Sequence, residues 1–166
     1  FSGSDSFNFI VGDGRGGTNT YTAAVKVLPV TSTLEGSEQV DQLLGSPAAD
    51  ALFGHGGNDR LTGAAGDDLI DGGAGIDTSV LTATRARFQL TKTAFGWTLK
   101  DNSGTDGNDS ITGIERLKFS NRDLALDLDG NAGIVTQVIR ALFGKAELTN
   151  KLYVGVGLKL LDDGMS

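Results

Sequence analysis

The chain has 166 residues, a formal net charge of −7 at pH 7 and no cysteine. The negative charge disfavours nucleic acid and anionic membrane surfaces as partners, and no run of apolar residues is long enough to span a bilayer. Glycine occurs 25 times, about twice its usual share of roughly 7%.

Residues 1–30 predict a β-hairpin. Phe7, Phe9 and Val11 alternate with polar neighbours, and so do the apolar residues of 21–27. Between them, residues 12–17 (GDGRGG) give a strong turn signal. The stretch resembles the final hairpin of the cadherin-like or Ig-like repeats of large bacterial surface proteins. Because a hairpin alone is only marginally stable, we expect it to pair with strands before Phe1 or to dock on the segment that follows.

Residues 31–35 are expected to be a short polar link. From Gly36 to Val80 the chain consists of five consecutive nine-residue units that each open with glycine: GSEQVDQLL, GSPAADALF, GHGGNDRLT, GAAGDDLID and GGAGIDTSV. The sixth position is always aspartate, namely Asp41, Asp50, Asp59, Asp68 and Asp77. The eighth position is Leu43, Leu52, Leu61 and Ile70, and only the last unit has Ser79 there. The fourth position is glycine in the last three units alone.

These units closely resemble the G-G-x-G-x-D-x-U-x nonapeptide of the RTX family, a calcium-binding repeat in which U is a large apolar residue. The resemblance implies a parallel β-roll, in which each unit gives a turn and a short strand and two units complete one coil. Turn glycines supply backbone angles that other residues resist, and one apolar side chain per strand faces inward. We therefore expect a mainly β fold: an RTX solenoid with flanking antiparallel hairpins and a small C-terminal helical segment.

The core of such a roll is thin. One aliphatic side chain per unit contributes roughly 1.5–3 kcal/mol when buried, whereas ordering the backbone costs about 1–2 kcal/mol for every residue. The aspartates of units n and n+2 would also converge on one side of the roll and repel one another. Calcium resolves both problems because it takes about six to eight oxygen ligands. Surroundings made of oxygen alone favour a hard cation over a transition metal.

The repeat spacing predicts three calcium sites, flanked by Asp59 and Asp77, by Asp50 and Asp68, and by Asp41 and Asp59. We rank the first highest and the third lowest, because the first two units lack the fourth-position glycine and the second contains Pro47. The remaining ligands would be turn carbonyls, with help from Asn58 and Asp67. The complete set of predicted ligand residues is Asp41, Asp50, Gly54, Gly56, Asn58, Asp59, Gly63, Ala65, Asp67, Asp68, Gly72, Ala74, Ile76 and Asp77.

Two alternatives to a permanently folded roll stay open. One is a disordered linker rich in glycine and aspartate, which five units in phase make unfavourable. The other is a segment that is disordered without calcium and folds when calcium binds. In the first hairpin, Asp5 and Asp13 are either calcium ligands between domains or turn residues, and we favour the turn.

Residues 85–100 predict a second hairpin that caps the open end of the roll. Its apolar face would be Phe88, Leu90, Trp97 and Leu99, and Trp97 is expected to pack in this cap rather than to bind a ligand. Residues 104–112 (GTDGNDSIT) form a sixth nonapeptide, out of phase with the others. Its Asp106, Asn108 and Asp109 either bind calcium or form an Asx-rich turn. The following GIERLKFSNRDLAL resembles the strand pair that ends many RTX rolls.

Residues 127–133 (DLDGNAG) are not an EF-hand loop, because Gly133 falls at loop position seven and Val138 at position twelve. Their carboxylates are instead expected to favour a helix N-terminus. Apolar spacing predicts a helix over 132–143 that stops at Gly144, and a second over 151–161 capped by Asn150. This tail resembles the start of a helical domain that often follows RTX repeats. The expected divisions are therefore 1–30 (end of a cadherin-like or Ig-like repeat), 31–128 (roll and capping strands) and 129–166 (two helices).

The sequence predicts no enzyme. The chain has no cysteine and one histidine, His55, so few side chains are available for the usual nucleophile–base pairs. His55 is expected to be a turn residue rather than a zinc ligand, since no second His or Cys exists to join it.

The resemblance implies a calcium-dependent structural and interaction module of a secreted bacterial adhesin or surface protein. Such a chain would be exported unfolded through a one-step, type I secretion channel and would contact a cell surface or neighbouring domains of the same protein. The alternative is an accessory domain of a secreted RTX enzyme, such as a protease, lipase or epimerase. We expect the chain to be a fragment, so the residues before Phe1 would decide: tandem sandwich repeats favour the adhesin, and a catalytic domain favours the enzyme.

Overall fold

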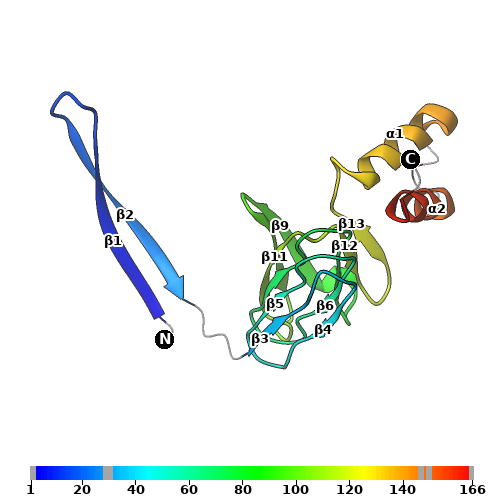
Figure 1. Ribbon diagram of the computed structural model, residues 1–166, viewed down its shortest axis with the longest axis horizontal. Helices are drawn as coiled ribbons and strands as arrows, with labels where there is room; N and C mark the ends of the chain where they lie inside the picture. The colour runs from blue at the N-terminus through cyan, green and yellow to red at the C-terminus, as the bar shows by residue number, and fades with distance from the viewer. Residues whose placement is uncertain (1–2, 28–31, 146–147, 149–150, 165–166) are drawn as a thin grey trace.

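The computed structural model describes residues 3–27, 32–145, 148 and 151–164. Strands dominate it: two sheets form a roll, an antiparallel hairpin precedes the roll, and two helices follow it (Figure 1). The predicted mainly β fold with a parallel roll is therefore confirmed.

The first hairpin consists of β1 (Gly3–Gly12) and β2 (Thr18–Val27), which pair in antiparallel register. Asp13 closes its turn, since one carboxylate oxygen accepts the N–H groups of Arg15 (2.7 Å) and Gly17 (3.0 Å). The turn role predicted for Asp13 is confirmed, whereas the side chain of Asp5 lies outside the described residues. The hairpin exposes its large apolar side chains, and the exposed fractions of Phe7, Phe9, Ile10, Val11 and Tyr21 run from 43% to 69%.

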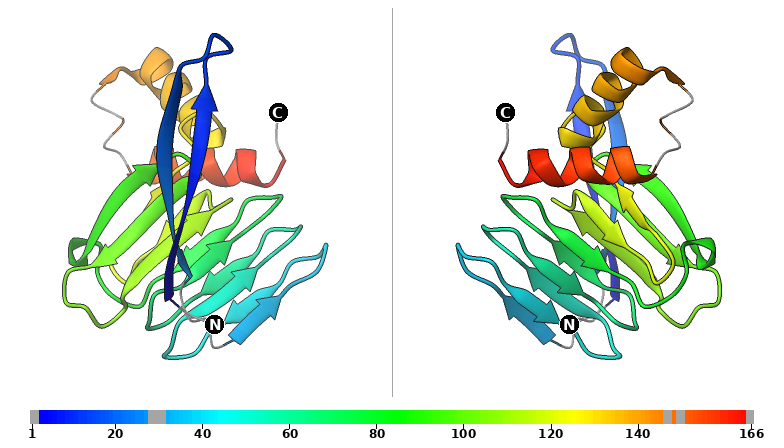
Figure 2. Two further views of the ribbon diagram at one scale, coloured as in Figure 1. Left: turned by 90° about the vertical axis from the view of Figure 1, so that its left-hand side faces the viewer. Right: turned by 90° about the vertical axis from the view of Figure 1, so that its right-hand side faces the viewer.

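The nine-residue units wind into two parallel stacks. One stack contains β3 (Ser32–Glu35), β5 (Asp50–Phe53) and β7 (Leu69–Asp71), and the other contains β4 (Gln42–Leu44), β6 (Arg60–Thr62) and β8 (Thr78–Val80). The eighth-position side chains fall in register, with Leu52 opposite Ile70 and Leu43 opposite Leu61. Figure 2 shows the stacked strands, with the first coil at one end of the roll. Two units therefore make one coil, as predicted.

The expectation of a polar link before the first unit was wrong for residues 32–35. These residues form β3, which pairs with β5 so that Leu34 lies opposite Leu52. Leu34 lies nine residues before Leu43, so it takes the next inward place in the repeat even though no glycine or aspartate of the pattern accompanies it. It packs, partly buried, against the core. The strand therefore joins the sheet by backbone pairing and inward apolar contact, without the glycine and aspartate of the repeat.

The capping hairpin lies at the far end of the first sheet. A short 3₁₀ turn (Arg85–Arg87) leads into β9 (Phe88–Thr93) and β10 (Gly96–Asp101), and the sheet order is β3-β5-β7-β11-β10-β9. Phe88 and Leu99 are buried, while Leu90 and Trp97 pack partly buried against the same core. The predicted capping face is confirmed. Because β10 runs antiparallel to β11 (Asn108–Thr112), it ends the parallel stack.

The sixth nonapeptide rejoins the stack despite its phase. Its strand, β11, pairs in parallel with β7 and places Ile111 opposite Ile70. The residues of the inserted hairpin explain the irregular spacing in the sequence, since they leave the coil and return to it. In the second sheet β12 (Arg116–Lys118) pairs in parallel with β8, and β13 (Asp123–Ala125) ends the sheet in antiparallel orientation. The predicted terminal strand pair is therefore present.

The core lies between the two sheets and includes Leu52, Leu61, Ile70, Leu99, Ile111 and Leu117, each at most 2% exposed. Ser79, which occupies the eighth position of the last unit, is buried and lies between Leu61 and Leu117 in the sheet register. The core is continuous but only one side chain wide per strand, as the repeat predicts.

Two helices follow the roll, α1 (Asn131–Phe143) and α2 (Lys151–Asp162). The first ends at Gly144, whose φ of 86° favours glycine, and both predicted helices are present within one residue. The predicted cap Asn150 lies outside the described residues. No helix in the described ranges is long and apolar enough to cross a membrane.

Arg116 fastens the helices to the roll. Its guanidinium donates to Asp127 before α1 and to both carboxylate oxygens of Asp162 in α2, at 2.6 and 3.0 Å. Asp127 also accepts the N–H of Ala132 at 3.4 Å, which is the helix-capping contact expected of this acidic stretch. The domain boundaries at residues 30 and 128 stay predictions.

Candidate metal centre

The sixth-position aspartates form two ladders, one on each side of the roll. In each ladder, one carboxylate oxygen accepts the backbone N–H of the aspartate eighteen residues earlier. These bonds run from Asp41 to Asp59 (2.8 Å), from Asp50 to Asp68 (2.9 Å) and from Asp59 to Asp77 (2.8 Å). The sequence beyond the repeats continues both ladders, because Asp68 N–H donates to Asp109 (3.1 Å) and Asp77 N–H donates to Glu115 (2.9 Å). We call these rows the aspartate ladders.

The other oxygen, Oδ2, has no hydrogen-bond partner in Asp59, Asp68 and Asp77. These residues are 1%, 3% and 0% exposed. A buried carboxylate oxygen without a partner is strongly unfavourable. Burial accordingly raises the pKa of Asp68 and of Asp77 to about 6, although the ladder hydrogen bonds lower it in part. For Asp77 the neighbouring charges of Glu115, Asp59 and Asp71 raise the pKa further.

Each of these oxygens lies at a glycine that opens a unit. A Cβ on Gly54 would meet Asp59 Oδ2 and the carbonyl oxygen of Gly72, and a Cβ on Gly63 would meet Asp68 Oδ2. The first position is therefore glycine because oxygen atoms crowd it. We call this arrangement, an Oδ2 atom beside a unit-opening glycine, a glycine corner.

The glycine corners offer only oxygen atoms as possible metal ligands, which suits calcium better than a transition metal. Among the described residues, no three His, Cys, Asp or Glu side chains are grouped to hold a metal. The predicted ligand set therefore needs backbone carbonyls, and that of Gly72 lies at the corner of Gly54 and Asp59; carbonyl coordination stays a prediction.

The turns between the corners need left-handed backbone. The fourth-position glycines Gly57, Gly66 and Gly75 have φ values of 112°, 107° and 142°, and the second position is also left-handed at His55 (70°) and Ala64 (81°). At Gly57 a Cβ would lie 2.5 Å from the backbone of Gln39 in the preceding coil, so only glycine fits. Close stacking of turns thus explains why the fourth position is glycine here.

The fifth-position side chains brace one turn against the next. Asn58 Oδ1 accepts the N–H of Ile76 (2.9 Å), and Asp67 Oδ1 accepts the N–H of Asn108 (2.8 Å). The sequence predicts these two side chains as additional calcium ligands. In the structure the single oxygen of Asn58 and one oxygen of Asp67 accept hydrogen bonds from the next turn, and their role as calcium ligands stays a prediction. Of the predicted carbonyl donors, that of Ala74 accepts Gly57 N–H at 3.0 Å, and Gly56 pairs with Ala74 in a parallel bridge. Ala65 lies in the fourth turn, half-buried.

The first two turns are closed differently, by serine. Asp41 Oδ2 accepts both the N–H (2.6 Å) and the hydroxyl (2.8 Å) of Ser37. Asp50 Oδ2 accepts the same two groups of Ser46, at 2.5 and 2.8 Å. Hydrogen-bond donors thus satisfy the Oδ2 atoms of Asp41 and Asp50, unlike those of Asp59, Asp68 and Asp77. The role of Asp41 and Asp50 as calcium ligands stays a prediction. A serine in the second position was the missed signal.

His55 is a turn residue, as predicted. Its Nε2 lies 2.6 Å from Glu35 Oε2, and both side chains are about half exposed. This contact links the third turn to the end of β3 on the surface of the roll.

An arginine closes the turn before β11, which the sequence did not reveal. Asp101 is buried, and its carboxylate binds the Arg87 guanidinium together with the N–H groups of Ser103, Thr105 and Asp106. Hydrogen bonds from Arg87 hold the pKa of the Asp101 carboxyl well below its usual range.

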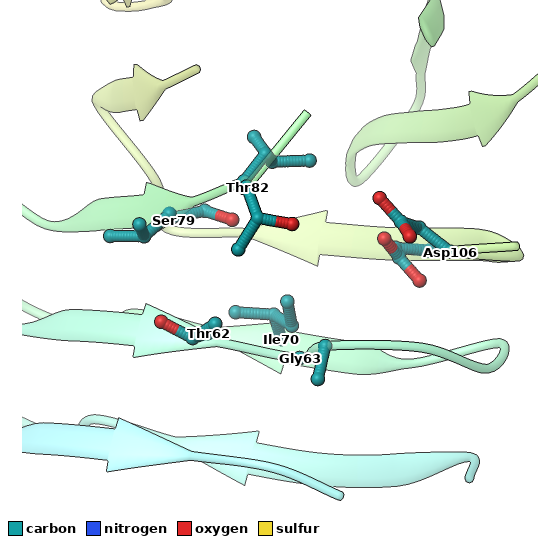
Figure 3. Close-up of a pocket in the computed structure, with 10 residues that line it drawn as sticks. Thr62, Gly63, Ile70, Ser79, Thr82 and Asp106 are labelled. Carbon is teal, nitrogen blue, oxygen red and sulfur yellow. The ribbon is translucent and has the colours of Figure 1, made fainter. Parts of the chain in front are cut away.

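The Arg87 guanidinium thus places a positive charge beside the sixth nonapeptide. Asp109 belongs to an aspartate ladder, and burial raises its pKa to about 8. Asp106 lines a small cavity with Thr62, Gly63 and Thr82 (Figure 3). Asp106 also lies 3.5 Å from Arg87.

Comparison with known proteins agrees with the geometry. Residues 44–78 match the sequence model of the RTX calcium-binding nonapeptide repeat (4 copies). No curated protein sequence matches the chain. Among solved structures, the extracellular lipase LipA from Serratia marcescens is similar with a TM-score of 0.48 and 22% identity, over 56% of this chain and 15% of the lipase. The chain thus contains a calcium-binding RTX repeat module.

Proposed function

We propose that the chain is a structural and interaction module of a secreted bacterial adhesin or surface protein, and that it folds when it binds calcium after export. One observation carries the calcium dependence: three buried Oδ2 atoms without partners, at Asp59, Asp68 and Asp77. Without a cation these like charges oppose winding of the roll. With calcium the same oxygens become ligands, so binding free energy becomes folding free energy.

The thin core makes this coupling effective. Each coil buries only two inward aliphatic side chains, such as Leu52 and Leu61, so apolar burial alone does not offset the cost of ordering the backbone. A chain of this kind would stay unwound where calcium is scarce and would pass a secretion channel unfolded. It would then fold on reaching an external medium that contains calcium.

The proposed role is non-catalytic. The sequence has one histidine and no cysteine, and His55 is engaged with Glu35 on the surface. The repeat carboxylates each hold a structural place, with one oxygen of Asp59, Asp68 and Asp77 in the ladders and the other assigned here to calcium. The hairpin β1–β2, with its resemblance to the end of a sandwich repeat, favours an adhesin or surface protein over a secreted enzyme.

Circular dichroism and calorimetry across a calcium titration test the folding role. We expect strand signal to rise between chelator and millimolar calcium, with heat that accompanies the rise. A strand signal that stays constant would refute the coupling. The residues encoded before Phe1 test the setting separately: sandwich repeats there support an adhesin, and a catalytic domain would instead make the roll the accessory domain of an enzyme.

A further inference from the structure

The ladder that contains Asp59 and Asp77 ends outside the repeats, at residues 113–115. Glu115 takes the place of the next aspartate, because its Oε2 accepts the N–H of Asp77. Gly113 takes the place of the next unit-opening glycine, because a Cβ on Gly72 would meet the Gly113 carbonyl oxygen and would lie 2.7 Å from Asp77 Oδ2. The glycine corner of Gly72 and Asp77 is therefore completed by residues outside the recognised repeats, since the family match ends at residue 78.

This last corner has fewer carbonyls than the others. In the fifth unit six residues, 72–77, precede β8, whereas only three residues, 113–115, precede β12. The short segment lacks the middle part of a full turn and therefore brings fewer backbone carbonyls to this corner. An additional donor is needed if Asp77 Oδ2 is to share a complete set of ligands.

Asp71 is positioned to be that donor. The ninth position is Leu44, Phe53, Thr62, Asp71 and Val80 in the five units, so it is acidic only in the unit that leads into this corner. A Cβ on Gly113 would lie 3.2 Å from Asp71 Oδ1 and 3.1 Å from the carbonyl oxygen of Gly73. Asp71 and the Gly73 carbonyl thus lie at Gly113, and the Gly113 carbonyl and the unpartnered oxygen of Asp77 lie at Gly72. The negative charge of Asp71 is close enough to Asp77 to raise the pKa of that carboxyl.

Side chains do not neutralise this group of charges. Among the described residues, the ion pairs of the structure involve neither Asp71 nor Asp77. The nearby basic residue of β12, Arg116, is occupied by Asp127 and Asp162. Asp77 is 0% exposed, so water cannot solvate its free oxygen.

We propose that Asp71, Asp77 and the carbonyl oxygen of Gly113 form a further calcium site between the last repeat and β12. The site rests on the proposed calcium function but lies outside the repeat pattern, and it replaces the missing carbonyls of a short turn with a second carboxylate. Because β12 also holds Arg116, an ion here joins the repeats to the strands that anchor the helices. Calcium then orders the C-terminal part of the chain as well as the roll.

The variant Asp71→Asn, made in the full chain, tests the site by calorimetric calcium titration. The amide keeps the shape of the side chain and removes one negative charge, and calcium affinity depends on the charge of the ligands. We expect the number of bound ions to fall by one at calcium concentrations that saturate the unaltered chain. Asp123→Asn, at an exposed acid of β13, is the matched control and is expected to keep the full number.

Hydrogen exchange of the unaltered chain supplies a second measurement that requires no variant. Amides of residues 113–118 are expected to gain protection with calcium, together with those of residues 54–62. Asp71→Asn with full stoichiometry, or residues 113–118 unchanged while residues 54–62 become protected, would overturn the site. If Asp71→Asn does not fold, the exchange result decides. A chain that binds no calcium at all would instead contradict the proposed function.

Discussion

Replacing Asp59 or Asp41 with asparagine separates the two ways in which turns are closed. Asp59 Oδ2 is buried without a partner beside the carbonyl of Gly72, so Asp59→Asn removes a charge that a cation requires. An ion present at one hundred times its dissociation constant contributes about 2.7 kcal/mol to the stability of the folded state. We expect Asp59→Asn to lose roughly this amount at saturating calcium and to bind one ion fewer.

Asp41→Asn is expected to cost a similar free energy without the loss of an ion. Asp41 Oδ2 accepts the N–H and the hydroxyl of Ser37 at 2.6 and 2.8 Å. Hydrogen bonds to a charged acceptor contribute about 1.5–3 kcal/mol each, and partial exposure of Asp41 lowers this to roughly 1–3 kcal/mol in total. The stability should fall, but the calcium stoichiometry should stay that of the unaltered chain.

The assay is urea unfolding at saturating calcium, followed by fluorescence of Trp97, the single tryptophan, with ions counted by calorimetry. Trp97 is partly buried against the core, so its emission reports whether the capped end of the roll is folded. The reasoning is refuted if Asp41→Asn loses an ion and Asp59→Asn keeps all of them. Equal stoichiometry in both variants would show that the unpartnered oxygen does not mark a site.

Three further predictions follow from the core, from the helix anchor and from the buried carboxyls. Leu61→Ala, at a fully buried eighth position of the core, is expected to lower the free energy of unfolding by about 2–5 kcal/mol in urea at saturating calcium, without a change in the number of bound ions. Arg116→Ala leaves two half-buried carboxylates without their cation and is expected to destabilise the docked helices by roughly 1–3 kcal/mol, seen as faster hydrogen exchange over 127–162 only. Lowering the pH through about 6 should weaken calcium binding in titration calorimetry, because Asp68 and Asp77, with pKa values of about 6, must lose their protons to bind. In chelator the sign reverses: the folded state binds more protons than the unfolded state between the ordinary pKa of 3.8 and about 6. The calcium-free equilibrium should therefore shift toward the wound roll as the pH falls across that range, and circular dichroism in chelator would measure this as a rise in strand signal.

The repeats made the coil predictable because their spacing is also the spacing of the structure. Leu43 and Leu61 are eighteen residues apart in the sequence and lie opposite each other in adjacent strands. A fixed period of nine therefore predicts the strand partners, the inward side chains and the side of the roll on which each aspartate lies. The two helices were predictable for a similar reason, since apolar residues recur at helical spacing and Gly144 ends the first.

The nine-residue period does not predict the structure where the chain departs from that period. Leu34 keeps the inward position, but the residues before it lack the glycine and the aspartate of the repeat. The sequence therefore predicts a link where β3 lies. The sixth nonapeptide returns to the stack only after a hairpin has been inserted, and counting residues cannot reveal that return.

The repeat pattern also did not reveal the hydrogen-bond partners of the aspartates. All five sixth-position aspartates look alike in sequence, yet Ser37 and Ser46 satisfy two of them while three have an oxygen without a partner. Whether a carboxylate needs a metal depends on the donors that surround it, and here those come from the second residue of the same unit, which varies while the aspartate does not.

The ladders also give the roll a direction. Every bond joins a donor N–H to an acceptor one coil closer to the C-terminus, as between Asp50 and Asp68. A cut on the N-terminal side leaves a carboxylate oxygen without its donor, whereas a cut on the C-terminal side leaves an N–H group without its acceptor. The two ends of a shortened roll would therefore present opposite hydrogen-bonding groups, and in the intact chain Glu115 and Asp109 supply the final acceptors.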